Sequence, residues 1–102
     1  MIEVVNKPYS YSFKSYASKN KNILCLSGDL TSSCEVDIFR DEYPKQFISM
    51  GMAEQNMMSF AGGLAMSGFV PFIHTFGVFA YRRPYDQLLA SIAYPCRKVR
   101  IM

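Results

Sequence analysis

Short apolar runs alternate along this chain with longer stretches of mixed polarity. The runs have the near-continuous apolar sequence that is typical of strands covered on both faces. They are residues 23–26, 47–50, 70–74 and 99–102. The stretches between them predict helices at residues 9–20, 53–66 and 83–93, and a polar loop with one helical turn at residues 30–42.

The order of these elements predicts the fold class. A helix followed by alternating strands and helices indicates an α/β fold, in which a parallel sheet has right-handed crossovers and helices on both faces. The spacing of apolar residues indicates which helix positions face the core. They are Tyr9, Phe13, Tyr16 and Ala17 in the first helix, and Met57, Phe60, Ala61 and Leu64 in the second. Because the sequence stops as the fourth strand begins, we expect an incomplete sheet and the first part of a longer polypeptide.

Composition narrows the class of protein. The chain has 102 residues, enough for one small domain, and its 19% of charged residues exclude a disordered chain. A net charge of +3 is too weak to indicate nucleic-acid binding. The three cysteines form no CxxC pair, and there is no signal-peptide pattern, so a reducing cytoplasm is expected. The 8 Phe, 7 Tyr and 7 Met predict a partner surface or missing sequence, because so small a domain cannot hide them all.

Residues 57–81 raise the possibility of a membrane span, because they contain no Lys, Arg, Asp or Glu. Several glycines and Pro71 interrupt this stretch, however, and Ser67-Gly68 indicates the end of a helix before a new strand. A helix and a strand that are both buried in a soluble fold fit the pattern better.

The residues after the strands are candidates for chemistry, because open α/β sheets bind ligands at the carboxyl ends of their strands. Asp29 follows the first strand, Glu54 follows the second, and His74 ends the third. Glu54 lies in the first turn of a helix among apolar neighbours. A helix N-terminus favours a carboxylate by about 0.3–1 kcal/mol, while burial opposes its charge. Such a carboxyl suits proton sharing with a ligand nitrogen; the alternative is an acid that caps its own helix.

Aromatic residues gather after the third strand. Phe76, Phe79 and Tyr81 form either ordinary core or a slot for a flat heterocycle. His74 is either a core histidine or a base. No His or Cys partner lies at metal-ligand spacing, and the chain has no GxGxxG or Walker loop, so no metal site is expected in it.

A resemblance to a known family is carried by three segments. These are GDLTSS (residues 28–33), FISMGMAEQNMMSFAGGLAMSG (residues 47–68) and PFIHTFGVFAYRRPYDQL (residues 71–88). They resemble the pyrimidine-binding domain of transketolases and are similar to the matching domain of 1-deoxy-D-xylulose-5-phosphate synthases. The resemblance covers residues 9–102, after an N-terminal extension of residues 1–8. It implies a thiamine-diphosphate-binding fold, with thiamine diphosphate as the cofactor.

The resemblance also implies a role for individual residues. Glu54 matches the family's catalytic glutamate, which hydrogen-bonds N1′ of the thiamine aminopyrimidine and so promotes loss of the proton from C2 of the thiazolium. Phe76 and Phe79 match the aromatic residues that pack around the pyrimidine. These three residues are the core of the cofactor site that the resemblance predicts.

Three further residues are assigned by position. Asp29 matches the acid of the family's DLT motif, which lies near the cofactor at the dimer interface. Arg82 falls where sugar transketolases commonly have Tyr and deoxyxylulose-phosphate synthases have Arg, which makes it a further candidate for cofactor binding. His74 has no constant counterpart in the family and is a candidate for the substrate channel.

The family's diphosphate-binding half, with its GDG…N motif for a divalent metal, has no counterpart in this sequence. The resemblance therefore implies the start of the C-terminal subunit of a split transketolase, with Mg²⁺ expected on a partner subunit. Such a chain is inactive alone and transfers a two-carbon ketol unit between sugar phosphates only after assembly. The alternatives are an enzyme like 1-deoxy-D-xylulose-5-phosphate synthase, or a non-catalytic remnant that only binds a partner.

Overall fold

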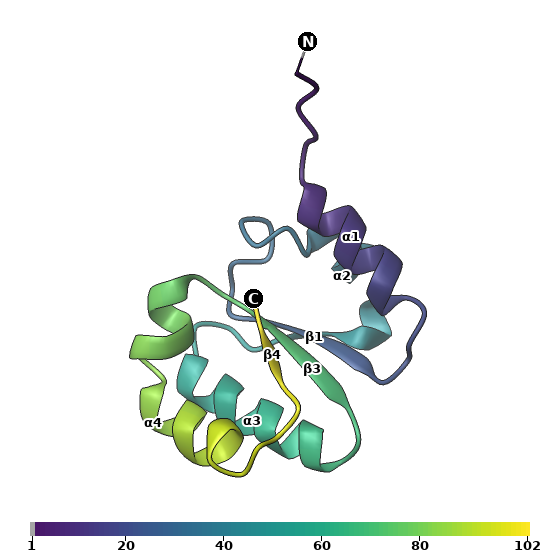
Figure 1. Ribbon diagram of the computed structural model, residues 1–102. Coiled ribbons are helices and arrows are strands. Elements are labelled where there is room, and N and C mark those ends of the chain that lie inside the picture. The colour runs from purple at the N-terminus through teal and green to yellow at the C-terminus, as the bar shows by residue number, and fades with distance from the viewer. Residues whose placement is uncertain (1) are drawn as a thin grey trace.

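A parallel sheet of four strands in the order β2-β1-β3-β4 forms the centre of the protein (Figure 1). A computed structural model describes residues 2–102 of the chain. The strands are β1 (Ile23–Ser27), β2 (Phe47–Ser49), β3 (Val70–His74) and β4 (Arg100–Ile101). Ser27 at the end of β1 is level with Ser49 of β2 and His74 of β3, so three loops leave the sheet at the same edge. The predicted strands and their parallel arrangement are confirmed.

Helices cover both faces of this sheet, as predicted. Figure 1 shows α1 and α2 on one side of the strands, and α3 and α4 on the other. In chain order the helical elements are α1 (Pro8–Ala17), α2 (Asp37–Glu42), the 3₁₀ turn η1 (Pro44–Gln46), α3 (Glu54–Met66), the π-helical turn η2 (Val78–Arg82), α4 (Tyr85–Leu88) and the π-helical turn η3 (Leu89–Ala93). Residues 2–6 extend away from both layers.

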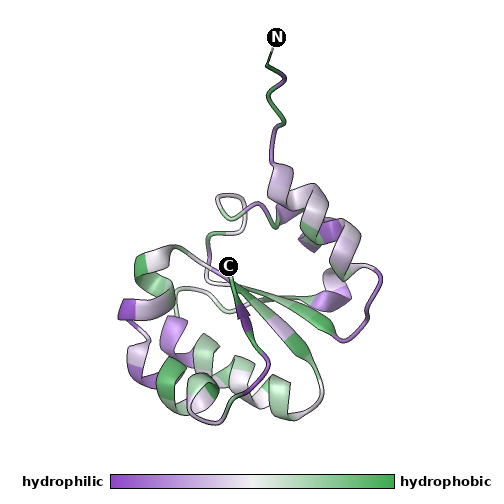
Figure 2. Cartoon of the chain, viewed as in Figure 1, coloured by the Kyte–Doolittle hydropathy of each residue, from purple (hydrophilic) through white to green (hydrophobic). Residues whose placement is uncertain are grey.

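Strand β1 divides the core into two halves, because successive side chains of a strand point to opposite faces of the sheet. Its odd-numbered Ile23 and Cys25 pack with Phe13 of α1 and Phe39 of α2. Leu24 and Leu26 pack on the opposite face, in the cluster that is completed by Met57, Met58, Ala61, Ile73 and Ile92. Figure 2 shows the resulting distribution, with apolar strands between helices of mixed polarity.

Two predicted core positions are wrong. Phe60 of α3 is 41% exposed, and Tyr16 of α1 is 62% exposed. The buried stripe of α3 includes Met58 in place of Phe60, because the helix turns Gly62 toward η3. A side chain at residue 62 would come within 2.5 Å of the carbonyl oxygen of Ser91, so the two backbones approach at a distance that glycine permits.

The helical region after β3 begins earlier than the sequence predicts. Helical turns start at Val78 instead of residue 83, and Pro84 lies between η2 and α4 instead of in a first turn. Proline has no backbone N–H, so a hydrogen-bonded helix is interrupted where it occurs. The backbone N–H of Arg83 instead donates to the carbonyl of Val78, which closes the wider π-helical turn.

Within residues 2–102, no helix is both long and apolar enough to cross a bilayer. The uncharged stretch at residues 57–81 is divided among α3, β3 and the beginning of η2. Helix α3 ends at Met66, and Gly68 follows with a φ of 95°, a conformation that glycine adopts without strain. The predicted helix stop at Ser67-Gly68 is thus confirmed.

Candidate functional site

The loops after β1 and β2 meet the η2 region around a small cavity at the carboxyl edge of the sheet. Its volume is about 140 Å³. The lining residues are Gly28, Asp29, Leu30, Met52, Glu54, Phe79 and Arg83. The structure therefore brings together three of the residues that the sequence singles out, namely Asp29, Glu54 and Phe79. It adds one that sequence reasoning missed, Arg83.

Glu54 is the first residue of α3, and only 3% of it is exposed. Its Oε1 accepts a hydrogen bond of 3.0 Å from Nη1 of Arg83, which makes a salt bridge. In the described residues, no side-chain cap closes the N-terminus of α3. The Glu54 carboxylate is thus paired with Arg83, and its role in a cofactor site stays a prediction.

Arg83 joins Glu54 to the aromatic side of the cavity. Its guanidinium carbon lies 4.4 Å from the centre of the Phe79 ring, a distance typical of cation–π contact. The backbone carbonyl of Arg83 accepts a 3.4 Å hydrogen bond from the side chain of Gln55, so its main chain is tied to the first turn of α3. Glu54, Phe79 and Arg83 together are called the Glu54 cluster below.

The neighbouring arginine, Arg82, does not join this cluster. It is exposed at the end of η2, whereas Arg83 is four residues after Phe79 and shares its helical face. The resemblance selects Arg82 by its position in the family motif. The wider π-helical turn sets which arginine faces Glu54, and the sequence does not reveal this turn. A contact between Arg82 and a cofactor stays a prediction.

The loop that carries Asp29 is exposed yet held in place at both ends. Asp29 has a left-handed backbone with φ 65°. The preceding Gly28 packs closely under the site, since a side chain there would lie 3.3 Å from both Met57 and Thr75. Asp29 is thereby held at the rim of the cavity.

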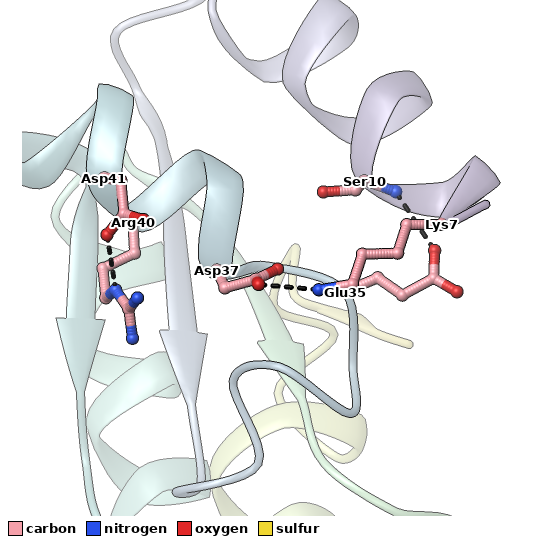
Figure 3. A network of polar contacts seen from close by, with 6 residues as sticks. All are labelled: Lys7, Ser10, Glu35, Asp37, Arg40 and Asp41. Carbon is pink, nitrogen blue, oxygen red and sulfur yellow. Dashed lines mark hydrogen bonds and ion pairs between the residues drawn. The ribbon is translucent and has the colours of Figure 1, made fainter.

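The far end of the same loop is fixed to α1 by a network of polar contacts (Figure 3). The Glu35 carboxylate accepts hydrogen bonds from the backbone N–H groups of Tyr9, at 2.9 Å, and Ser10, at 3.3 Å. Lys7 forms a 2.7 Å salt bridge with Asp37, which holds the pKa of that carboxyl below its usual range. Glu35 thus provides the helix N-terminus with the acceptor that its own sequence lacks.

Phe76 lies apart from the Glu54 cluster. It is 46% exposed and lines a different cavity, of about 300 Å³, together with Tyr9, Cys34, Glu35 and His74. The structure therefore separates the two aromatic residues that the resemblance assigns to the pyrimidine. Phe79 lines the same cavity as the buried carboxylate of Glu54, and Phe76 does not.

His74 is buried, and both of its ring nitrogens have partners. Nε2 is 2.7 Å from the hydroxyl of Tyr9, and Nδ1 is 3.5 Å from the sulfur of Cys25. Burial lowers the pKa of His74 to about 4, and it raises the pKa values of the Tyr9 hydroxyl and the Cys25 thiol. These contacts are those of a neutral core histidine, and binding of substrate by this side chain would require them to break. Within residues 2–102, no group of three His, Cys, Asp or Glu side chains is arranged to hold a metal ion.

The fold and the site define a class of protein. It is a parallel α/β domain with a buried glutamate at the start of a helix and an aromatic ring in the lining of the same cavity. The family model of the transketolase pyrimidine-binding domain matches residues 6–102. The chain belongs to this family, and the resemblance noted in the sequence is confirmed.

The relatives that this chain matches are larger proteins, and the match covers one part of each. The chain is 40% identical over 87 residues to the 6-deoxy-6-sulfo-D-fructose transketolase subunit SqwH of Clostridium sp. (strain MSTE9), covering 85% of this chain and 27% of the relative. It is 34% identical over 98 residues to a putative transketolase C-terminal section of Methanocaldococcus jannaschii, covering 96% of this chain and 31% of the relative. A 1-deoxy-D-xylulose-5-phosphate synthase of Lawsonia intracellularis is 33% identical over 76 residues, which are 74% of this chain and 12% of that enzyme.

A solved structure has the same fold. It is described as a split-gene transketolase in the form of an inactive β4 tetramer, and it superposes with a TM-score of 0.80 at 38% sequence identity. The match covers 91% of this chain and 31% of the solved chain. This chain therefore spans less than a third of the length of the relatives described here.

Proposed function

We propose that this chain is the aminopyrimidine-binding part of a thiamine-diphosphate-dependent transketolase, which transfers a two-carbon ketol unit between sugar phosphates. The observation that carries the proposal is the buried carboxylate of Glu54 in one cavity with the ring of Phe79. A carboxylate excluded from water at a helix N-terminus can hold a proton at one chosen nitrogen of a bound heterocycle. Membership of the pyrimidine-binding family supplies the identity of that heterocycle.

The residues of the site fit an aminopyrimidine ring. Glu54 is the proton-sharing partner of N1′, and Phe79 packs against the ring face, where an aromatic contact contributes about 0.5–1.5 kcal/mol beyond area burial. Thiamine diphosphate supplies the carbanion chemistry when bound. Asp29, Phe76 and Arg82 are assigned to its surroundings by family position, with Asp29 at the rim of the cavity.

The activity requires a second chain in this proposal. The partner is a diphosphate-binding subunit, and the Mg²⁺ that holds the diphosphate is expected there. Support comes from exposed large apolar side chains in the loop after β2 and in the segment that follows β3. They are Met52, Phe76, Val78, Tyr81, Tyr85 and Leu89, each more than 36% exposed. Exposed side chains of this kind are those that a partner subunit would cover. We place the assembled enzyme in the cytoplasm and expect homo- or hetero-oligomers of this chain.

Coexpression with a diphosphate-binding subunit tests the proposal. We expect the chain alone to aggregate or oligomerise in analytical ultracentrifugation, and the mixture to form a defined complex. Titration calorimetry with thiamine diphosphate and Mg²⁺ then reports binding by the complex only. A stable monomer, or a complex that binds no cofactor, contradicts the proposal and supports a non-catalytic remnant.

A second reaction is favoured by the relatives that are 1-deoxy-D-xylulose-5-phosphate synthases. In that case the complex condenses a pyruvate-derived unit with an aldehyde, and carbon dioxide is released. Incubation with pyruvate and an aldehyde phosphate distinguishes the two, since ketol transfer between sugars releases no carbon dioxide. Both reactions use Glu54 in the same role.

A further inference from the structure

The guanidinium of Arg83 has the shape and hydrogen-bonding pattern of the ligand proposed for this site. It is a planar cation with N–H donors in its plane. One N–H group donates to Glu54 at 3.0 Å, and the guanidinium carbon lies over the Phe79 ring, 4.4 Å from its centre. A bound aminopyrimidine would use the same two partners, its edge on Glu54 and its face on Phe79. Two groups cannot occupy this position at once.

We infer that Arg83 is a placeholder, which occupies the aminopyrimidine position in the cofactor-free protein and leaves it when thiamine diphosphate binds. The inference rests on the function proposed above for Glu54 and Phe79. The position would bind planar groups that donate N–H hydrogen bonds, and the side chain of Arg83 is such a group.

Electrostatics explains why the Glu54 carboxylate needs a partner. The side chain of Glu54 is 4% exposed, and a buried carboxylate without a partner is strongly destabilising. Among the described residues, the hydrogen bond to its carboxylate comes from Arg83. The guanidinium therefore stabilises the cofactor-free protein, and the incoming ring must replace that contact.

Arg83 is also placed so that it can leave. Its side chain is 54% exposed, so the guanidinium can move into water without opening the core. Its main chain is tied to Gln55, so the movement is confined to the side chain. Glu54 and Arg83 also line an adjoining hollow of about 300 Å³ with Gln55 and Asn56.

Replacement of Arg83 by Met tests the inference in the complex with the diphosphate-binding subunit. We expect thiamine diphosphate to bind about three- to tenfold more tightly in calorimetry, because a competing ion pair of modest strength is removed. The melting temperature without cofactor falls at the same time. Arg40→Met is the matched control: Arg40 is 47% exposed and paired with Asp41, but it lies in α2. It removes the same charge and should leave the affinity unchanged.

The outcomes separate the inference from the function on which it rests. Wild-type complex that binds no thiamine diphosphate overturns both. Wild-type binding with equal or weaker binding by Arg83→Met overturns the placeholder alone. Equal binding would mean that Arg83 does not compete with the cofactor, and weaker binding would make it a direct contact. If Arg83→Met does not fold, nitrogen-15 NMR of the wild-type guanidinium groups decides. An Arg83 signal that is protected from exchange without cofactor should lose this protection on binding, and one that keeps it refutes the inference.

Discussion

Glu54 and Arg83 are 29 residues apart in the chain, and their charged atoms are 3.0 Å apart. The pair joins the first turn of α3 to the helical region after β3, so it forms only when both crossovers are in place. One partner is buried and the other is half exposed. This asymmetry lets the carboxylate stay fixed while its partner changes.

Truncation of Phe79 to Ala should weaken the binding of thiamine diphosphate to the assembled enzyme by about 1–3 kcal/mol, because stacking and apolar burial are both lost. Titration calorimetry measures the change. Tyr94→Ala is the control, since Tyr94 is 86% exposed and its loss should leave the affinity as it is. Unchanged binding by the Phe79 variant would place this ring in the core and outside the site.

Two adjacent glycines of α3 should respond to alanine in opposite directions. Gly62→Ala puts a methyl group 2.5 Å from the carbonyl of Ser91, so helix and backbone must separate, at a cost of about 1–3 kcal/mol. A methyl group at residue 63 would have no atom from outside its own helix within 4 Å. Alanine there should stabilise the helix by about 0.5–1 kcal/mol. Urea unfolding of both variants checks the sign, and equal effects would show that α3 and η3 do not approach so closely.

The pH dependence of stability should carry the signature of His74. Its folded pKa of about 4 lies below the ordinary 6.5, so the unfolded chain binds a proton that the folded chain excludes. Stability therefore falls as the pH decreases from about 6.5 to about 4, by roughly 3 kcal/mol in total, and this group has no effect above that range.

His74→Asn isolates this contribution from that of other groups. The variant loses the contacts with Tyr9 and Cys25 and should be less stable at neutral pH. Its unfolding free energy should nevertheless change less with pH below about 6.5 than that of the wild type. Parallel curves for the two proteins would mean that folding does not lower the pKa of His74.

The parallel sheet follows from features that the sequence displays. Continuous apolar runs such as residues 23–26 identify buried strands, and their alternation with helices implies parallel crossovers. The carboxyl edge of the sheet then locates Asp29 and Glu54 in one region. This much depends on local patterning and on general topology, which is why it could be predicted.

The rest depends on packing between elements that are distant in sequence. The π-helical turn at Val78–Arg82 determines that Arg83, and not Arg82, faces Glu54. The contact of Gly62 with Ser91 turns α3 so that Phe60 is exposed. The residue pattern of one segment does not show which arginine a π-helical turn directs inward. It also does not show where two distant backbones approach each other.

The most direct test of the account is the exchange of the thiazolium C2 proton in the complex of Glu54→Gln with the diphosphate-binding subunit. Glutamine keeps the shape and a hydrogen-bonding group but cannot share the proton. Hydrogen–deuterium exchange at C2 should therefore slow by about 10²–10⁴-fold, as is typical when general acid–base function is lost, while cofactor affinity falls only modestly. If Glu54 only stabilises its helix, the substitution costs no more than about 1 kcal/mol of stability, and an exchange rate within a few-fold of wild type would contradict the catalytic role.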